Sequence, residues 1–245
     1  MSKQTGRGRR AFTVRRHVVQ FSGGIGSFAV AVWVARKYGT RNLTLLIADT
    51  GIEDDDLWRF AEDTSQLLGV PLTKVADGRT PWEVFRDVRF LGNDRLAPCT
   101  RLLKQVPCRE WMEQHADPAD TLVYVGIENN RRDRARIPAI ARNWKPWVTR
   151  FPLCGKWEPA RTKEQLLDEA RALGVAPPRL YGLGFGHNNC GGRAFARASA
   201  SGSTCWRSCP SGTRTPRSGR RNCGSCSATS ASSVIAEAAS AGPSR

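Results

Sequence analysis

The sequence lacks several features that identify common protein classes. No hydrophobic run among its 245 residues approaches the roughly 20 residues that a membrane-spanning helix needs. It contains neither a Gly-x4-Gly-Lys-[Ser/Thr] phosphate-binding loop nor a Gly-x-Ser-x-Gly nucleophile elbow, and no internal repeat is visible. These absences argue against an integral membrane protein, a P-loop nucleotidase and an α/β-hydrolase. We expect no membrane partner.

We expect no export signal, although Arg9-Arg10 superficially resembles a twin-arginine motif. Such a signal needs an apolar segment and a small-residue cleavage site, whereas Arg15-Arg16-His17 follows here. We therefore expect residues 1–16 to form a disordered basic arm and the chain to be cytoplasmic. Its eight cysteines are then expected to be reduced rather than paired.

Positive charge dominates the composition but is concentrated at the two ends of the chain. The formal net charge is +16. Residues 1–16 contain six Lys or Arg and no acid, and residues 193–245 contain eight Arg and one Glu, which leaves 24 basic and 21 acidic residues between them. Basic proteins often bind nucleic acid. Here that interpretation applies to the basic arm and not to the body of the chain.

The body, residues 17–192, alternates between strand and helix signals. The almost continuously apolar run at 43–48 is typical of a strand buried in a parallel sheet. Thr162 and Gln165 form a capping box that opens a helix ending at Gly174. The alternation predicts an α/β, doubly wound, Rossmann-like domain with a mostly parallel sheet and helices on both faces. The expected strands are 17–21, 43–48, 71–75 and 121–126, and the other expected helices are 26–38, 54–68, 81–88 and 102–114.

The composition changes abruptly near residue 193. Residues 193–245 contain no Leu, Lys, Asp, Tyr, His, Gln or Met, and Ser, Ala and Arg occupy 31 of their 53 positions. No helical or strand period survives, so the segment cannot bury enough apolar surface to offset its ordering entropy. It is either a disordered tail or the product of reading a GC-rich gene in another frame, and the composition favours the second interpretation.

The most informative segment is the transition from the strand at 17–21 into the helix expected at 26–38. Between them lies the loop Ser22–Ser27, which contains three glycines and two serines. Glycines let the backbone approach an oxyanion closely, and the free N–H groups at the start of a helix point toward it. We expect this loop to bind a phosphate group. A tight turn without a ligand is the alternative.

Two further groups of polar residues follow strand ends. Asp49 and Glu53 come after the second strand, where each can bind a metal ion or a ribose hydroxyl, or else cap the turn and start the next helix. Gly126 ends a later strand and is followed by Arg134 and Arg136. Guanidinium groups suit phosphate or sulfate oxygens, although a solvated run of charges is the alternative.

The cysteines allow several interpretations. Cys99 lies where a helix begins, which can lower a thiol pKa, and Lys104 is one turn further on, where it can reach an anion. Cys190 lies in a polar, glycine-rich segment with His187 and is a candidate nucleophile or redox thiol. Cys108 and Cys154 are expected to be small buried residues.

A metal centre is not expected from the cysteine spacing. Cys99, Cys108, Cys154 and Cys190 match no standard zinc or iron–sulfur pattern. The tail pairs Cys205-x3-Cys209 and Cys223-x2-Cys226 have the spacing of a zinc ribbon, but the residues between them lack its strands and apolar positions.

Taken in order, these motifs resemble those of a known family. The loop Ser22-Gly23-Gly24-x-x-Ser27 resembles the pyrophosphate-binding loop, or PP-loop, of the adenine nucleotide α-hydrolase superfamily, with Ile25 and Gly26 at its variable positions. The later motifs resemble those of its phosphoadenosine phosphosulfate (PAPS) reductase branch. They are Asp49-Thr50-Gly51-x-Glu53, Cys99 with Lys104, and Gly126 followed by Arg134 and Arg136. The resemblance spans residues 17–192 and implies that these loops bind an adenine nucleotide.

The resemblance implies one of two reactions. In the first, the enzyme cleaves ATP between its α and β phosphates and adenylates an unknown acceptor, with Mg²⁺ neutralising the pyrophosphate, Asp49 helping to place the metal and Lys104 reaching the anion. In the second, Cys190 attacks the sulfur of PAPS or adenosine phosphosulfate (APS), and a thioredoxin-like reductant then releases sulfite. A non-catalytic nucleotide-binding relative is a third interpretation.

The sequence departs from the family pattern at three places. Ile25-Gly26 stands where the family usually has Lys-Asp, which supports the non-catalytic interpretation. Cys190 lies in Asn-Cys-Gly-Gly, whereas reductases have Glu-Cys-Gly-x-His, which favours adenylation over reduction. Similar chains continue beyond this point with another cysteine and a helical region, whereas this one enters the Arg/Ser/Ala-rich tail, which supports the shifted reading frame.

Overall fold

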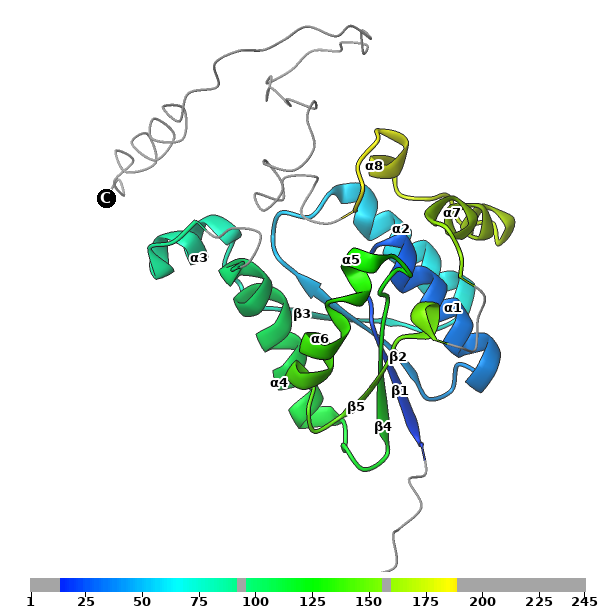
Figure 1. The fold of residues 1–245 in the computed structure, drawn as a ribbon, viewed down its shortest axis with the longest axis horizontal. Helices are drawn as coiled ribbons and strands as arrows, with labels where there is room; N and C mark the ends of the chain where they lie inside the picture. Colours follow the sequence, from blue (N-terminus) through cyan, green and yellow to red (C-terminus); the bar gives the residue numbers. More distant parts are fainter. Residues whose placement is uncertain (1–13, 92–95, 156–159, 189–245) are drawn as a thin grey trace, which may run out of the picture. The chain divides into compact units, whose positions relative to one another are not determined.

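The computed structural model confirms the predicted α/β fold (Figure 1). It describes residues 14–91, 96–155 and 160–188, all of which lie in one compact unit. Five parallel strands form a sheet in the order β3-β2-β1-β4-β5. Their bounds are β1 Arg16–Gln20, β2 Leu43–Asp49, β3 Leu72–Ala76, β4 Thr121–Val125 and β5 Val148–Arg150.

Strand β1 lies at the centre of the sheet, between β2 and β4. His17 pairs with Leu43 on one side and with Leu122 on the other. The chain passes from β1 to β2 and β3 on one side, then returns across the sheet to form β4 and β5 on the other side. The connection that follows β1 therefore leads toward one edge of the sheet, and the connection that follows β4 leads toward the other edge. In open α/β sheets, the crevice at such a reversal is where ligands bind.

Helices α1 (Ile25–Tyr38), α2 (Asp55–Leu68) and α7 (Lys163–Ala172) cover one face of the sheet. Strand residues Val19, Leu45 and Tyr124 point to this face and are almost fully buried. They pack against apolar side chains such as Phe28 and Phe60, whose rings lie 5.4 Å apart. This larger core fixes where α1 begins, because the helix follows the loop directly.

Helix α4 (Val106–His115) covers the opposite face. There the alternate strand residues Val18, Leu46 and Val123 pack against Cys108, Met112, Trp144 and Trp147, which together form a second buried cluster. Both faces of the sheet are therefore covered. This explains why the central strands read as nearly continuous apolar runs in the sequence.

Most of the predicted helices are confirmed, with ends close to those that their caps indicate. Asp54 caps α2, which ends at Gly69 in the left-handed conformation (φ +62°). Thr80 and Glu83 form a capping box for α3 (Pro81–Val88). Thr162 and Gln165 do the same for α7, as predicted. These ends follow from local hydrogen bonding, so a sequence pattern is enough to find them.

One helix differs from its prediction and several short elements were missed. The helix expected at 102–114 is a π-helical turn, η1 (Thr100–Gln105), followed by α4. The change of pitch occurs next to Pro107, which has no N–H to donate to an α-helical ladder. The missed elements are β5, α5 (Arg131–Arg134), α6 (Ile137–Asn143), η2 (Pro152–Cys154) and α8 (Arg179–Gly182). Each is too short to show a hydrophobic period.

Some predictions fall on residues that the structure does not describe. They concern the basic arm before residue 14, the tail after residue 192, and Cys190 with the four cysteines of the tail. Their structure and any nucleic-acid contact remain predictions. In the described parts of the chain, no helix combines the length and the apolar character needed to cross a membrane.

Candidate functional site

A cavity of about 770 Å³ opens at the carboxyl ends of β1, β2 and β4. One wall is the Ser22–Ser27 loop, and the opposite wall is formed by η1 and the start of α4. Residues 126–128 after β4 and residues 187–188 close further sides. The cavity therefore lies at the reversal of strand order, where the topology predicts a ligand site.

Close packing favours glycine at two positions of the Ser22–Ser27 loop, Gly23 and Gly26, and at Gly126. Gly23 has φ +70°, and a Cβ there would lie 2.5 Å from the Leu57 side chain. A Cβ on Gly126 would lie only 2.6 Å from backbone atoms of Gly26 and Ser27. Gly26 and Gly126, which are 100 residues apart in the sequence, thus allow the backbones of their two segments to come into contact. The first turn of α1 is held directly against the end of β4.

Internal hydrogen bonds shape the loop but leave several of its amides available. The Ser27 hydroxyl donates to the Gly24 carbonyl oxygen at 2.7 Å and accepts from the Ser22 N–H at 3.2 Å. The Ile25 N–H donates to the Tyr181 hydroxyl at 3.1 Å. Within the described residues, the N–H groups of Gly24, Gly26 and Ser27 make no hydrogen bond. These three donors lie at the positive end of the α1 dipole.

Tyr181, which the sequence analysis missed, belongs to the wall of this loop. It lies on α8, and its hydroxyl would be 3.4 Å from a Cβ on Gly24. Burial raises the pKa of Tyr181 to about 12, so the phenol keeps its proton at neutral pH. The oxygen accepts from Ile25 while the O–H still has a proton to donate. Only the tertiary structure brings residue 181 to residue 25.

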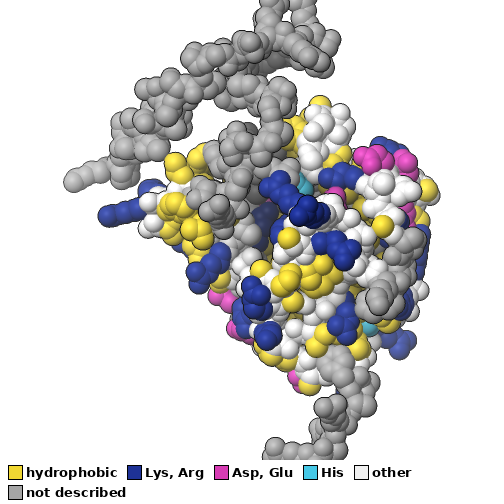
Figure 2. All heavy atoms as spheres, in the orientation of Figure 1, with side chains coloured by type: hydrophobic (Ala, Val, Ile, Leu, Met, Phe, Trp, Pro, Cys, Tyr) yellow, Lys and Arg dark blue, Asp and Glu magenta, His cyan; other side chains and the backbone are white. Residues whose placement is uncertain are grey.

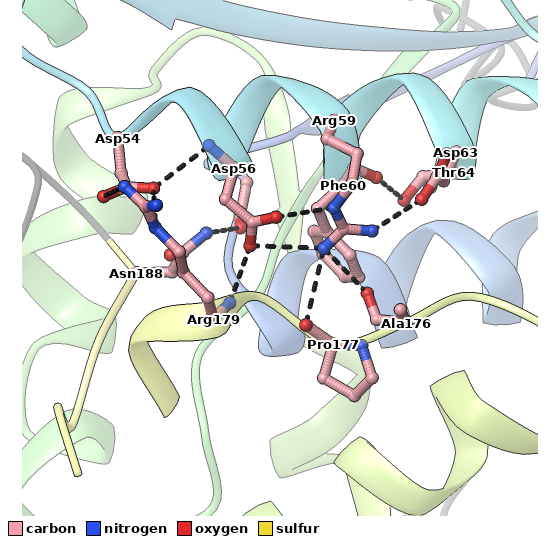
Figure 3. Close-up of polar contacts among 11 residues, drawn as sticks. Asp54, Asp56, Arg59, Phe60, Asp63, Thr64, Ala176, Pro177, Arg179 and Asn188 are labelled. Carbon is pink, nitrogen blue, oxygen red and sulfur yellow. Dashed lines mark hydrogen bonds and ion pairs between the residues drawn. The ribbon is translucent and has the colours of Figure 1, made fainter. Parts of the chain in front are cut away.

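Helix α8 is attached to α2 by a network of charged groups (Figure 3). The Arg179 guanidinium donates twice to Asp54 at 2.8 Å, and the Arg179 N–H donates to Asp56 at 2.6 Å. Arg59 donates to Asp56 and to the carbonyl oxygens of Ala176 and Pro177. The hydrogen bond from Arg59 is the main cause of a lowered Asp56 pKa. We call residues 176–188 the C-terminal strap of the described chain: this network attaches its first residues to α2, and its residues Tyr181, His187 and Asn188 line the cavity.

The loop after β2 is tied together by its own side chains and by Lys104 from η1. Asp49 accepts a hydrogen bond from the Gly51 N–H at 2.8 Å and does not line the cavity. Thr50, which is buried, donates to Glu53 at 3.0 Å. Lys104 from η1 donates to the same Glu53 oxygen at 2.9 Å, and the Glu53 side chain is only 2% exposed. Thr50, Glu53 and Lys104 all line the cavity, and they form part of its wall as a linked group.

The segment after β4 brings charge of both signs to the cavity. Arg136 lines it and pairs with Asp133 at 3.2 Å, whereas Arg134 donates to Asn129 and does not line it. Glu128 also lines it, 3.4 Å from Lys163, and burial raises the Glu128 pKa in spite of that lysine. Figure 2 shows many Lys and Arg side chains, and few acidic ones, on the face that includes α5 and α6.

Three cysteines are described, and two of them line the cavity. Cys99 is half-buried at the start of η1, and Cys108 is buried in the second core cluster, where burial raises its pKa to about 11. Cys154 donates to the Ile127 carbonyl oxygen at 3.1 Å. Among the described residues, no group of three or more His, Cys, Asp or Glu side chains is placed to hold a metal ion. Cys190 lies outside these residues.

The structure thus divides the predicted site residues into two groups. The first group lines one cavity and consists of Ser22, Gly24, Gly26, Ser27, Thr50, Glu53, Lys104, Gly126 and Arg136. The second group does not line it and consists of Gly23, Ile25, Asp49 and Arg134. The Ile25 side chain is fully buried in the core, and Gly23 and Asp49 shape their turns. The functional roles of both groups remain predictions.

Comparisons with known proteins give matches of structure only. No protein-family model matches the chain, and no curated protein matches it. Among solved structures, 65 chains are similar. A PAPS reductase from Candida auris, solved as a phosphate complex, has 14% identity and a TM-score of 0.48 over 69% of this chain and 78% of that chain. A predicted subunit of a tRNA methyltransferase from Methanocaldococcus jannaschii has 16% identity and a TM-score of 0.38 over 64% and 76%. Both are likenesses of structure at low sequence identity.

Proposed function

We propose that the chain is an enzyme that binds an adenine nucleotide by its phosphates and transfers the adenylyl group of ATP to an acceptor. One observation carries this proposal. The N–H groups of Gly24, Gly26 and Ser27 make no hydrogen bond within the described residues, and all three residues line a cavity of about 770 Å³. Backbone donors at a helix start favour phosphate oxygens. The cavity volume falls within the roughly 300–1,000 Å³ typical of small-molecule sites.

The charges around the cavity suit a reaction that develops negative charge on pyrophosphate. An acceptor oxygen or nitrogen attacks the α-phosphorus, the bond between that phosphorus and the bridging oxygen to the β-phosphate breaks, and the electron pair leaves with pyrophosphate. Donors fixed in advance around the leaving group lower the barrier, because they need no reorganisation during the reaction. The loop amides and the Tyr181 hydroxyl supply such donors on one side. Arg101 and Arg136 bring positive charge from other sides.

Mg²⁺ fits this site only as a companion of the nucleotide. Three carboxylates line the cavity in the described residues, and each pairs with a cation: Glu53 with Lys104, Asp133 with Arg136, and Glu128 with Lys163 at the longer distance of 3.4 Å. Mg²⁺ in nucleotide sites is commonly bound through phosphate oxygens with one or two carboxylates. When bound, it would neutralise phosphate charge, and Glu128 is a carboxylate beside the loop, since its side chain would lie 3.7 Å from a Cβ on Gly26. Adenine as the base is proposed from the sequence motifs alone.

The test is incubation of the full chain with ATP, Mg²⁺ and candidate acceptors, followed by assay of pyrophosphate and adenylylated product. Release of pyrophosphate supports adenylyl transfer, and release of phosphate alone contradicts it. Tight binding of ATP without turnover supports the non-catalytic interpretation. Incubation with PAPS or APS and thioredoxin tests the reductase alternative, in which Cys190 is the thiol. Sulfite release in that experiment would show that the chain is a reductase and would contradict the proposed adenylyl transfer.

A matched pair of glycine variants tests the loop itself. In Gly24→Ala the added Cβ would lie 3.4 Å from the Tyr181 hydroxyl and 3.7 Å from the Ser22 hydroxyl, without a backbone clash. We expect this methyl group to obstruct the phosphate position and to weaken ATP binding by about tenfold, with little change in stability. Gly182→Ala is the control, because nothing lies within 4 Å of its Cβ position. Equal ATP affinity in both variants would contradict phosphate binding at the loop.

A further inference from the structure

Asn188, on the C-terminal strap, is buried beside the Ser22–Ser27 loop and uses only one end of its side-chain amide. The residue is 1% exposed, and its Nδ2 donates to the Gly23 carbonyl oxygen at 2.8 Å. Within the described residues, its Oδ1 accepts no hydrogen bond. A buried amide oxygen without a donor is rare, because it has lost its bonds to water and gained nothing in return. Such an atom calls for a functional explanation.

The contact with Gly23 fixes which end of the amide is unused. A backbone carbonyl oxygen can only accept a hydrogen bond, so the NH₂ end of Asn188 must face it. The reversed amide would place two acceptors 2.8 Å apart. The unpaired end is therefore an acceptor. Asn188 is one of the residues that line the cavity, so the unpaired acceptor belongs to the cavity wall.

The chemistry of the acceptor excludes phosphate as its partner. Ionised phosphate oxygens are acceptors too, and the N–H groups of Gly24, Gly26 and Ser27 are the donors suited to them. An amide oxygen next to these amides needs a hydroxyl or amino group. We infer that Asn188 is a specificity-determining residue whose Oδ1 accepts a hydrogen bond from a hydroxyl or amino group on the nucleoside part of the bound nucleotide. This inference rests on the proposed function, because it places phosphates on the loop.

Asn188 is held in place from several directions, as a recognition residue should be. The strap is fixed to α2 by Arg179 with Asp54 and Asp56 (Figure 3). It is fixed to the loop by the contact of the Tyr181 hydroxyl with Ile25. Asn188 adds its own hydrogen bond to Gly23. A fixed, buried acceptor discriminates strongly against a ligand that lacks the matching donor, because the acceptor then stays unpaired in the complex.

The first experiment removes donors from the ligand and leaves the protein intact. Calorimetry compares the binding of ATP, 2′-deoxy-ATP, 3′-deoxy-ATP, inosine triphosphate and inorganic triphosphate to the full chain. We expect one of the three analogues to bind about tenfold more weakly than ATP, as for the loss of one hydrogen bond to a buried group. A deoxy analogue identifies a sugar hydroxyl as the donor, and inosine triphosphate identifies the amino group of the base.

The second experiment removes the acceptor from the protein. Asn188→Leu keeps a similar volume without an amide, and Asn143→Leu is the matched control, since Asn143 lines the cavity from α6. In Asn188→Leu, ATP should bind about tenfold more weakly and no better than the discriminated analogue. In Asn143→Leu the discrimination should persist. Inorganic triphosphate, which has no nucleoside, should bind equally to the wild type and to both variants.

Two results would overturn the inference while leaving the proposed function intact. One is a wild type that binds ATP and triphosphate but distinguishes none of the analogues. The other is an Asn188→Leu variant that weakens triphosphate as much as ATP, because Asn188 would then only shape the loop through Gly23. If neither ATP nor triphosphate binds the wild type, the proposed function fails and this inference fails with it. If the variant misfolds, the analogue series on the wild type still tests the inference, because equal binding of ATP and every analogue overturns it.

Discussion

The loops after β1 and β2 lie at the same edge of the sheet and line the same cavity, yet they use their polar groups in opposite ways. In the loop after β2, the side chains bond to neighbours: Asp49 accepts from Gly51, and Glu53 accepts from Thr50 in the same loop and from Lys104 on η1. The loop after β1 leaves three backbone N–H groups without a hydrogen bond in the described structure. Both loops carry polar residues after a buried strand. The three unbonded N–H groups of the loop after β1 belong to residues that line the cavity, Gly24, Gly26 and Ser27.

The difference comes from glycine. Gly23, Gly24 and Gly26 have no side chains that could reach back to the amides of their own loop, and close packing against Leu57 and Gly126 excludes larger residues at two of these positions. The loop after β2 has acidic and hydroxyl side chains that bond to their neighbours. We therefore expect changes after β2 to act mainly on stability, and changes around the β1 loop to act on binding as well.

The largest effect is expected from Lys104→Met. This change removes a cation 2.9 Å from the buried Glu53 carboxylate, so the free energy of unfolding should fall by about 3 kcal/mol. The double variant Lys104→Met with Glu53→Gln should recover most of that loss, because no buried charge then lacks its cation. Urea unfolding at neutral pH measures both. A single variant as stable as the wild type would show that Lys104 serves the ligand and not the fold.

A smaller effect on stability, combined with an effect on binding, is expected from Gly126→Ala. The new Cβ would lie 2.6 Å from backbone atoms of Gly26 and Ser27, so the loop must move away from β4. We expect a loss of about 2 kcal/mol of stability and a clear loss of triphosphate affinity. Gly182→Ala, which meets nothing within 4 Å, is the control for urea unfolding and calorimetry. If Gly126→Ala bound triphosphate as tightly as the wild type, the contact of Gly126 with the loop would not be needed for binding.

The smallest effect is expected from Glu128→Gln. Burial raises the Glu128 pKa, so the carboxyl takes up its proton at a higher pH than an exposed glutamate and is fully charged only above that raised pKa. Its charge opposes an anion on the β1 loop, so Glu128→Gln should bind metal-free triphosphate a few times more tightly, roughly threefold, at pH 8. This advantage should shrink as the pH falls through the Glu128 pKa.

The measurement for this prediction is the ratio of variant to wild-type affinity across pH, which cancels the titration of the ligand. Glu164→Gln is the matched control, since Glu164 is exposed in the first turn of α7. Because burial disfavours the ionised form, the charged Glu128 side chain lowers the free energy of unfolding at pH values above its pKa. Glu128→Gln should therefore be no less stable than the wild type at pH 8. A ratio that does not change with pH would place Glu128 away from the bound anion.

The sequence by itself determined the parts that depend on near neighbours. The apolar strands, the caps of α2 and α7 and the glycine loop before α1 follow from hydrogen bonds and steric limits within a few residues. Alternation of these elements was enough to predict a parallel sheet and a ligand site at the ends of its strands. The predicted loop residues Ser22, Gly24, Gly26 and Ser27 do line the cavity there.

Tertiary structure alone decided which distant groups complete the site. Tyr181 reaches Ile25 across 156 residues, Asn188 reaches Gly23 across 165, and Lys104 reaches Glu53 across 51. Neither hydrophobic periodicity nor a helix cap predicts such pairs. They depend on the order of the strands in the sheet and on the ion pairs that attach the strap to α2. The elements α5, α6 and α8 escaped prediction because each is too short to show a hydrophobic period. Local chemistry makes the phosphate-type loop, and long-range packing decides what surrounds it.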